Sequence, residues 1–190
     1  MPQIITPKTD FEISQMIEIC AQNLVENNRD KMSSDDFSNK GFLIGKLTKE
    51  DVQEMLANQG KHFVAAVKES ENLQGYLTGC DLSESGIDFS LYVPNLNKIE
   101  GAKFFYHKQI VKRPEAKNVG SKLLLSMFDE AKARGYSHVI CRIVHQPFLN
   151  QSSISFHEKF GFKKVGEMSE NNNVLGIYLK ELSHNDQRRR

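Results

Sequence analysis

A short loop of small and basic residues, 117–121, has the composition of a phosphate-binding turn. It precedes a segment whose apolar residues recur at helical spacing, so it would lie beside the exposed N–H groups and the positive dipole end of a helix. Gly120 allows the backbone to approach a ligand closely, and Lys117 and Lys122 supply positive charge. A single glycine before a helix is also typical of an ordinary turn, so this loop alone is weak evidence for a ligand.

Several other chemical motifs are missing from the sequence. It contains neither GxxxxGK followed by Ser or Thr nor a GxGxxG after a strand, which disfavours nucleotide hydrolysis and hydride transfer. Cys20, Cys80 and Cys141 lie far apart, with no CxxC pair and no histidines at metal-ligand spacing, so we expect buried, reduced thiols without disulfide or metal. Cys141 could be a catalytic thiol, although a small apolar residue inside a strand is the commoner role.

Apolar periodicity predicts four helices, over residues 10–27, 48–60, 118–135 and 146–161. Asp10 is a candidate N-cap for the first helix, and a loop-like stretch, 27–45, follows it. Thr48 and Asp51 form a capping-box pattern at the start of the second. The third helix has a continuous apolar face and ends at Gly135.

Strand-like runs alternate with these helices, at residues 62–69, 74–82, 103–111, 137–144, 162–168 and 174–182. Polar turns at 70–73 and 169–173 join the first two and the last two runs as hairpins. The continuous β-branched run at 137–144 fits a strand covered on both faces. Residues 81–102 mix Gly, Pro and Asn and predict no particular conformation.

Length and charge limit the class of protein. The 190 residues fit one domain, and 25 Lys and Arg against 24 Asp and Glu leave no positive field that would favour nucleic acid. The N-terminus lacks a basic segment followed by an apolar one, and no apolar run approaches the roughly 20 residues that span a bilayer. We expect a cytoplasmic protein without membrane contact, and a disordered, solvated basic tail at 184–190.

The order of elements over residues 104–168 resembles the GNAT superfamily of acyl-CoA N-acyltransferases. That family has an acyl-CoA loop of the form Q/R-x-x-G-x-G/A between a strand and a helix, and the same window here reads EAKNVG. Gly120 matches strictly. Asn118 takes the place of the first glycine and is well able to adopt a positive φ, whereas Glu115 takes the place of the Gln or Arg.

A second motif extends the resemblance. The family's short helix reads roughly N-x-x-A-x-x-L/F-Y-x-x-x-G-F. Here it reads NQSSISFHEKFGF, in register at Asn150, Ser153, Phe156, His157, Gly161 and Phe162. The opening helices and the first hairpin also follow the family's order, so the resemblance covers nearly the whole chain.

The resemblance implies an acyl-CoA site. The residues expected to hold the diphosphate, mainly through backbone amides, are Lys117, Asn118, Val119, Gly120 and Ser121. Backbone groups of Ile110, Val111 and Lys112 would hold the acyl carbonyl and pair with pantetheine like an added strand. Asn150 would bond the pantetheine arm, although an Asn before a helix is also an ordinary N-cap.

The resemblance also implies catalytic roles. His157 stands where the family has a Tyr that protonates the departing CoA thiolate, and an imidazolium with a pKa of about 6.5 could do the same. A half-exposed helix histidine is the alternative. Residues 104–106 lack the family's proton-relaying Glu, so His107, Tyr106 or Glu100 could replace it. His107 ranks first, although strand alternation could turn it away from the site.

We therefore expect residues 1–183 to form one GNAT N-acetyltransferase domain of the α/β class, with a mixed, mostly antiparallel sheet flanked by helices on both faces. Acetyl-CoA is the implied co-substrate, and an amine would attack its thioester directly, through a tetrahedral intermediate and without a metal. Residues 28–47, where Asp35 and Asp36 could attract a cationic amine, and residues 81–102 would build the acceptor pocket. A catalytically weak acyl-CoA-binding or protein-interaction module is the alternative, and the oligomeric state stays open, a homodimer included.

Overall fold

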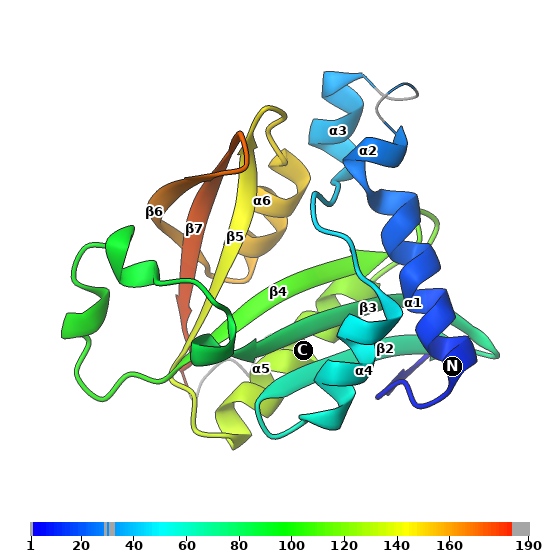
Figure 1. The fold of residues 1–190 in the computed structure, drawn as a ribbon, viewed down its shortest axis with the longest axis horizontal. Coiled ribbons are helices and arrows are strands. Elements are labelled where there is room, and N and C mark those ends of the chain that lie inside the picture. The colour runs from blue at the N-terminus through cyan, green and yellow to red at the C-terminus, as the bar shows by residue number, and fades with distance from the viewer. Residues whose placement is uncertain (1, 29, 31–32, 184–190) are drawn as a thin grey trace.

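A seven-stranded mixed sheet forms the centre of the described chain, residues 2–28, 30 and 33–183, in the computed structural model (Figure 1). The strands, in the order β1-β2-β3-β4-β5-β7-β6, are β1 (Gln3–Ile5), β2 (His62–Glu69), β3 (Asn72–Asp81), β4 (Phe104–Lys112), β5 (His138–Gln146), β7 (Asn173–Glu181) and β6 (Lys163–Glu170). Every neighbouring pair is antiparallel except β4 and β5. The predicted fold is confirmed. The sequence does not predict β1, because three residues are too few to show an alternation of apolar and polar side chains. The predicted tail, 184–190, lies outside the described residues.

The helices of the described residues are α1 (Asp10–Asn23), α2 (Val25–Asn28), α3 (Ser34–Lys40), α4 (Lys49–Ala57), α5 (Val119–Ala133) and α6 (Gln151–Lys159). The N-cap of α1 is Thr9, and the expectation of Asp10 is wrong. Thr9 Oγ1 accepts a hydrogen bond from Glu12 N, and Glu12 Oε2 accepts one from Thr9 N, both at 3.2 Å. Asp10 would lack such a reciprocal partner. The predicted capping box of Thr48 and Asp51 is confirmed at α4.

The loop predicted at residues 27–45 is wrong over 34–40, which form α3. Ser33 Oγ accepts from Asp36 N, and Asp36 accepts from Ser33 N, so a capping box starts this helix as well. Phe37 is the one buried residue that α3 contributes, so seven residues show no apolar repeat. Residues 81–102 contain the short 3-10 turns Leu82–Glu84, Phe89–Leu91 and Leu96–Lys98, in green at the left of Figure 1.

Helices cover both faces of the sheet. On one face, Leu123 and Met127 of α5 pack with Phe105 of β4, and α6 joins the same core. On the other face, α1 and α4 cover β2 and β3, and the 3-10 turns cover the C-terminal strands. Consecutive residues of β5, Ile140 and Cys141, pack into the cores on opposite faces, which confirms a strand buried on both sides. The three cysteines are buried, as predicted, and each is a free thiol.

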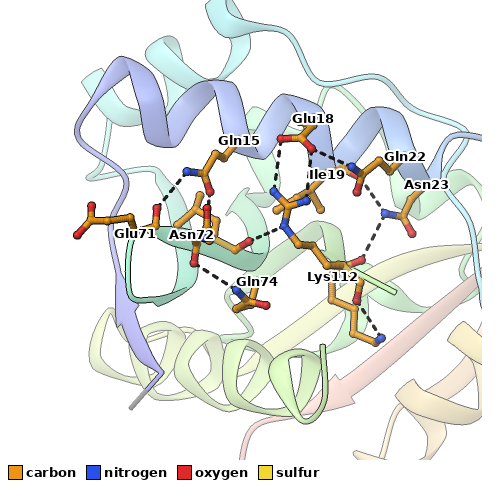
Figure 2. A network of polar contacts seen from close by, with 11 residues as sticks. Gln15, Glu18, Ile19, Gln22, Asn23, Glu71, Asn72, Gln74 and Lys112 are labelled. Carbon is orange, nitrogen blue, oxygen red and sulfur yellow. Dashed lines mark hydrogen bonds and ion pairs between the residues drawn. The ribbon is translucent and has the colours of Figure 1, made fainter. Parts of the chain in front are cut away.

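A polar network attaches α1 to the strands that approach the α5 loop (Figure 2). Gln15 Oε1 accepts from Leu73 N at 2.6 Å, at the start of β3. Asn23 Nδ2 donates to Lys112 O at 3.3 Å, at the end of β4. Arg113, the next residue, donates from Nε to Leu73 O at 2.9 Å. These bonds hold the end of β4 where the chain turns toward α5.

Gly75 lets β3, β4 and α5 approach one another closely. A Cβ built on it would lie 2.5 Å from Val111 O and 2.7 Å from Val119 Cγ1, and the backbone oxygen cannot move without shifting β4. We expect Gly75→Ala to lower the free energy of unfolding by about 1–3 kcal/mol, measured by urea denaturation. Gly60→Ala is the matched control, because its Cβ would meet no described heavy atom within 4 Å. Equal stability of the two variants would contradict this account of the packing.

Candidate active site

The two parallel strands, β4 and β5, lie together over only part of their length. Their pairing runs from Phe104↔His138 to His107↔Cys141 and then stops. Beyond these residues β4 continues beside β3 and β5 continues beside β7, so the strands diverge (Figure 1). Backbone N–H and C=O groups along the diverging edges lose their ladder partners, and such groups need a partner when they are buried.

A β-bulge marks the point of divergence. Lys108 is an extra residue in β4, because His107 and Gln109 on either side of it pair with consecutive residues of β3. The bulge comes directly after His107, the last residue of β4 that pairs with β5. Just before it, Tyr106 and His107 lie on opposite faces of the sheet, as strand alternation requires. Bulges change the direction of the side chains that follow them and often lie beside active sites.

A cleft of about 920 Å³ opens between the diverging strands. It is bounded by the second half of β4, by β5, by the first turn of α5, by α6 and by residues 39–46. Every residue predicted for acyl-CoA binding or for catalysis lines it except Lys117, Val119 and Glu100. The Val119 side chain is 4% exposed and packs into the core, and Lys117 is exposed. The structure thus brings the predicted residues together, and their roles stay predictions.

The N-terminus of α5 opens into this cleft without a side-chain cap. Asn118, its N-cap, has φ 60° and ψ 5°, the left-handed conformation expected for it, and its side chain makes no capping hydrogen bond to the described backbone. The first N–H groups of a helix have no intrahelical partner. Gly120 faces α6: a Cβ built on it would lie 3.4 Å from Cζ of Phe156. This glycine therefore provides space between two helices.

Residues 41–46, here called the strap, cross the cleft between α6 and β4. Asn150 Nδ2 donates to Phe42 O at 3.0 Å, and Gln109 Nε2 donates to Gly45 O at 2.7 Å. Asn150 Oδ1 also accepts from Ser153 N at 3.1 Å, which confirms that Asn150 is the N-cap of α6. The predicted contact with pantetheine is not tested by this geometry. The sequence does not predict the strap, because both anchors join residues distant in the chain.

His157 is 2% exposed, so the alternative interpretation, a half-exposed helix histidine, is wrong. Its Nδ1 lies 2.7 Å from Ser153 O, and because a carbonyl can only accept, Nδ1 carries the proton. Nε2 is then a bare acceptor, buried and without a hydrogen-bond partner among the described residues. Burial lowers the pKa of His157 to about 4, although the hydrogen bond to the Ser153 backbone acts in the opposite direction and raises it. The imidazole is therefore neutral at pH 7, and the imidazolium expected from the sequence is not the resting form.

His107 lies beside His157, with ring centres 5.4 Å apart and ring planes at 33°. It is 3% exposed, and its Nδ1 has no hydrogen-bond partner in the described part of the chain. Burial lowers its pKa well below the usual value, as does the charge of a protonated His157, while a hydrogen bond to the Thr78 backbone opposes this. Two neutral imidazoles, each with a bare ring nitrogen, therefore form one wall of the cleft.

On the opposite face of β4, Tyr106 is paired with an arginine. Arg142 of β5 donates from Nε to Tyr106 Oη at 3.1 Å and lies over the ring, 5.9 Å from its centre. Arg142 Nη1 also donates to Glu170 Oε2 at 2.6 Å. Burial raises the pKa of Tyr106, and the guanidinium opposes this rise. The sequence analysis missed Arg142, although a single charge within the apolar run 137–144 was a usable signal.

The acidic candidates lie away from the cleft. Asp36 forms an ion pair with Lys40 at 2.8 Å and bonds Ser33, and these contacts, Lys40 first, hold its pKa at about 2. Neither Asp35, Asp36 nor Glu100 lines the cleft, so the geometry does not support a role for them in attracting or deprotonating an amine. Residues 81–102 instead contribute Glu84, with its neighbours, to the lining.

The described residues contain no group of three or more His, Cys, Asp or Glu side chains placed to hold a metal ion. None of the helices found in them has both the length and the apolar character that crossing a membrane requires.

Parallel strands that diverge beside an open helix N-terminus define an acyl-CoA N-acyltransferase type of fold. The model of the acetyltransferase (GNAT) family matches residues 32–162. The chain belongs to this family.

Solved structures with the same fold share little sequence with the chain. An N-acetyltransferase from Staphylococcus aureus Mu50 is 18% identical, with a TM-score of 0.62 over 96% of this chain and 99% of that one. The yncA protein from Salmonella typhimurium, solved with its cofactor acetyl-CoA, is 18% identical, with a TM-score of 0.65 over 97% and 95%. The PaiA N-acetyltransferase from Thermoplasma acidophilum, in complex with coenzyme A, is 14% identical, with a TM-score of 0.59 over 93% and 98%. A comparison with curated proteins gives no match.

The two roles of Asn150 can be separated by substitution. Asn150→Ala removes both the helix cap and the strap anchor, and we expect a loss of about 2 kcal/mol in the free energy of unfolding. Asn150→Ser keeps a capping oxygen but is too short to reach Phe42 O, so it should recover about half of that loss. In both variants the amide protons of the strap should exchange faster with solvent. Unchanged exchange in Asn150→Ser would show that this bond does not hold the strap.

Proposed function

We propose that the protein transfers the acetyl group of acetyl-CoA to an amine by direct attack of the amine on the thioester. The observation that carries this proposal is the cleft between β4 and β5, which joins the uncapped N-terminus of α5 to the buried histidines at the bulge. Membership of the GNAT family supports the same reaction class.

The residues present fit the co-substrate. The first N–H groups of α5 suit a diphosphate, because the side chain of Asn118 leaves them uncapped and the helix dipole favours an anion. The unpaired edge of β4, from Ile110 to Lys112, can bond an extended pantetheine arm in the manner of an added strand. An amide NH2 has two N–H bonds, so Asn150 can bond Phe42 O and still offer a donor to a ligand.

The state of His157 determines what it can do in the reaction. Acetyl-CoA supplies an acyl group activated as a thioester. A neutral imidazole with a bare Nε2 cannot give a proton at the outset, but it can take one from the attacking amine nitrogen and pass it to the departing sulfur. The N–C bond then forms, the C–S bond breaks, and one proton moves from nitrogen to sulfur, so the histidine ends as it began.

One feature favours the alternative, an acyl-CoA-binding module with little activity. Residues 104–106 carry no carboxylate, and the phenol of Tyr106 is occupied by Arg142. Incubation with acetyl-CoA and a panel of amines, with detection of free thiol, separates the two functions. Turnover selects the enzyme, and saturable CoA binding without turnover selects the module.

Gly120→Asp tests the diphosphate site. The new carboxylate would lie at the N-terminus of α5 and repel the diphosphate, so CoA affinity should fall at least tenfold, or about 1.4 kcal/mol, in calorimetry. Gly120→Asn is the matched control, because it adds the same bulk against Phe156 without the charge. Equal affinities for the folded Asp and Asn variants would show that no diphosphate binds there.

His157→Phe tests the proton transfer. The ring is kept and the nitrogens are lost, so kcat should fall by about 10² while CoA affinity is unchanged, and His157→Tyr should retain much activity. The wild-type imidazole is already neutral above its pKa of about 4, so His157 should cause no loss of activity between pH 6 and 9. The wild type and His157→Tyr should therefore show no difference in this range that reflects the loss of a proton from His157. A loss of activity with rising pH in the wild type that is absent from His157→Tyr would show that His157 starts the reaction protonated, and would overturn this mechanism.

The same pKa has a consequence for stability. The folded pKa of His157 is lowered below the unfolded value of about 6.5, so the unfolded state binds the proton more readily, and stability is lost as the pH falls from about 6.5 toward 4. His157→Phe should lose less stability over this window than the wild type does. Identical pH dependence would show that burial does not lower this pKa.

A further inference from the structure

The charged residues that line the cleft are mostly basic. They are Lys40, Lys46, Lys108, Lys112 and Arg142, against one carboxylate, Glu84. Glu84 is itself ion-paired with Lys61. Within the described lining, a cationic substrate therefore finds no carboxylate that lacks a basic partner.

The basic residues divide by position. Lys40 and Lys46 are each ion-paired with an acidic residue outside the lining, at 2.8 and 2.9 Å. Lys112 Nζ donates to two backbone carbonyls of the turn that leads to α5, so it belongs to the end of the cleft where the diphosphate is proposed to bind. Lys108 and Arg142 directly follow His107 and Cys141, the last parallel pair, at the point where the strands diverge, and Arg142 is ion-paired with Glu170.

Lys108 and Arg142 flank Tyr106. Lys108 directly follows His107 in β4, and Arg142 directly follows Cys141, the partner of His107, in β5, so the two residues occupy neighbouring positions on adjacent strands. Burial raises the pKa of the Cys80 thiol to about 11, and the charge of Lys108 partly opposes this rise. Cys80 is the pairing partner of Tyr106 in the sheet, and Tyr106 holds the guanidinium of Arg142. The Lys108 side chain is exposed and forms no ion pair with a described residue. The Arg142 side chain is 20% exposed.

The pair has the properties of an anion site. A guanidinium presents several N–H donors in a planar fork that matches a carboxylate, and less entropy is lost when its orientation is already set. Tyr106 and Glu170 set the orientation of Arg142 from one side. Lys108 adds a positive charge on an exposed side chain of the adjacent strand. The histidines, by contrast, lie on the other face of β4, where Tyr106 does not reach.

We propose that the acceptor is a small amine that carries a carboxylate, and that Lys108 and Arg142 bind this carboxylate while the amine nitrogen faces the thioester. This inference rests on the proposed acyl transfer and names its substrate class. The positive charges of Lys108 and Arg142 would repel an acceptor that carries several positive charges, so a polycationic amine should be a poor substrate.

The test uses pairs of amines that differ by the carboxylate alone. Free-thiol release from acetyl-CoA is measured with phenylalanine and phenethylamine, with β-alanine and ethylamine, and with spermidine as a polycation. Aminoethylphosphonate, compared with β-alanine, distinguishes a carboxylate from a phosphonate. In at least one pair, kcat/KM should be tenfold or more higher for the carboxylate-bearing member.

Variants then assign the preference to the two residues. Lys108→Met and Arg142→Met should each lower kcat/KM for the carboxylate-bearing amine at least tenfold and for its matched amine less than twofold. Lys164→Met is the control, because Lys164 is basic, ion-paired with Glu167 and outside the cleft lining. If Arg142→Met fails to fold, Lys108→Glu remains, and its added negative charge should reverse the preference toward the amine without a carboxylate.

The outcomes are distinct. CoA binding with no thiol release from any amine would overturn the proposed function and this inference with it. Turnover that is equal within each pair, or that favours spermidine or the phosphonate, would overturn the inference and leave acyl transfer standing. A carboxylate preference that Lys108→Glu leaves unchanged would also overturn it.

Discussion

The parallel pairing of β4 and β5 ends after His107 and Cys141, and the site depends on this end. A sheet that diverges exposes backbone groups that cannot be buried without partners, so the gap must be held open and supplied with polar contacts. The α1 network holds the end of β4 to β3, and α6 packs beside β5 (Figure 1). The cleft therefore begins where the hydrogen bonding between β4 and β5 stops, and the residues around it line the gap between the two strands.

Burial decides what the polar residues in the cleft can do. His157 and His107 would titrate near neutral pH in water, but loss of solvent keeps both uncharged. Hydrogen bonding then sets the tautomer of His157, because Nδ1 donates its proton to Ser153 O and Nε2 is left without one. The same residue type in a half-exposed position would be an acid near pH 6, and here it is an acceptor.

Elements with a strong local pattern were predictable from the sequence. The apolar stripe of α5 and the β-branched run of β5 lie where periodicity places them, and Asn118 has the positive φ that its position in the loop suggested. The α3 helix has no apolar period, since only one of its seven residues is buried, and the spacing of Ser33 and Asp36 was its one usable signal in the sequence. The Tyr106–Arg142 contact, the histidine pair and the strap join residues that are distant in the chain. Such contacts depend on the tertiary fold, and the local pattern of one sequence does not predict them.

The strap is anchored in an asymmetric way. At both ends the protein supplies the donor from a side chain, Asn150 or Gln109, and the strap supplies a main-chain carbonyl. Every amino acid has that carbonyl, so these two anchors do not depend on the side chains of the strap. Phe42 packs against Phe37 and Leu43 packs against the core beneath α1, whereas Ile44 is 43% exposed. Ile44 is therefore the position where a change of side chain can alter the wall of the cleft while both anchors stay in place.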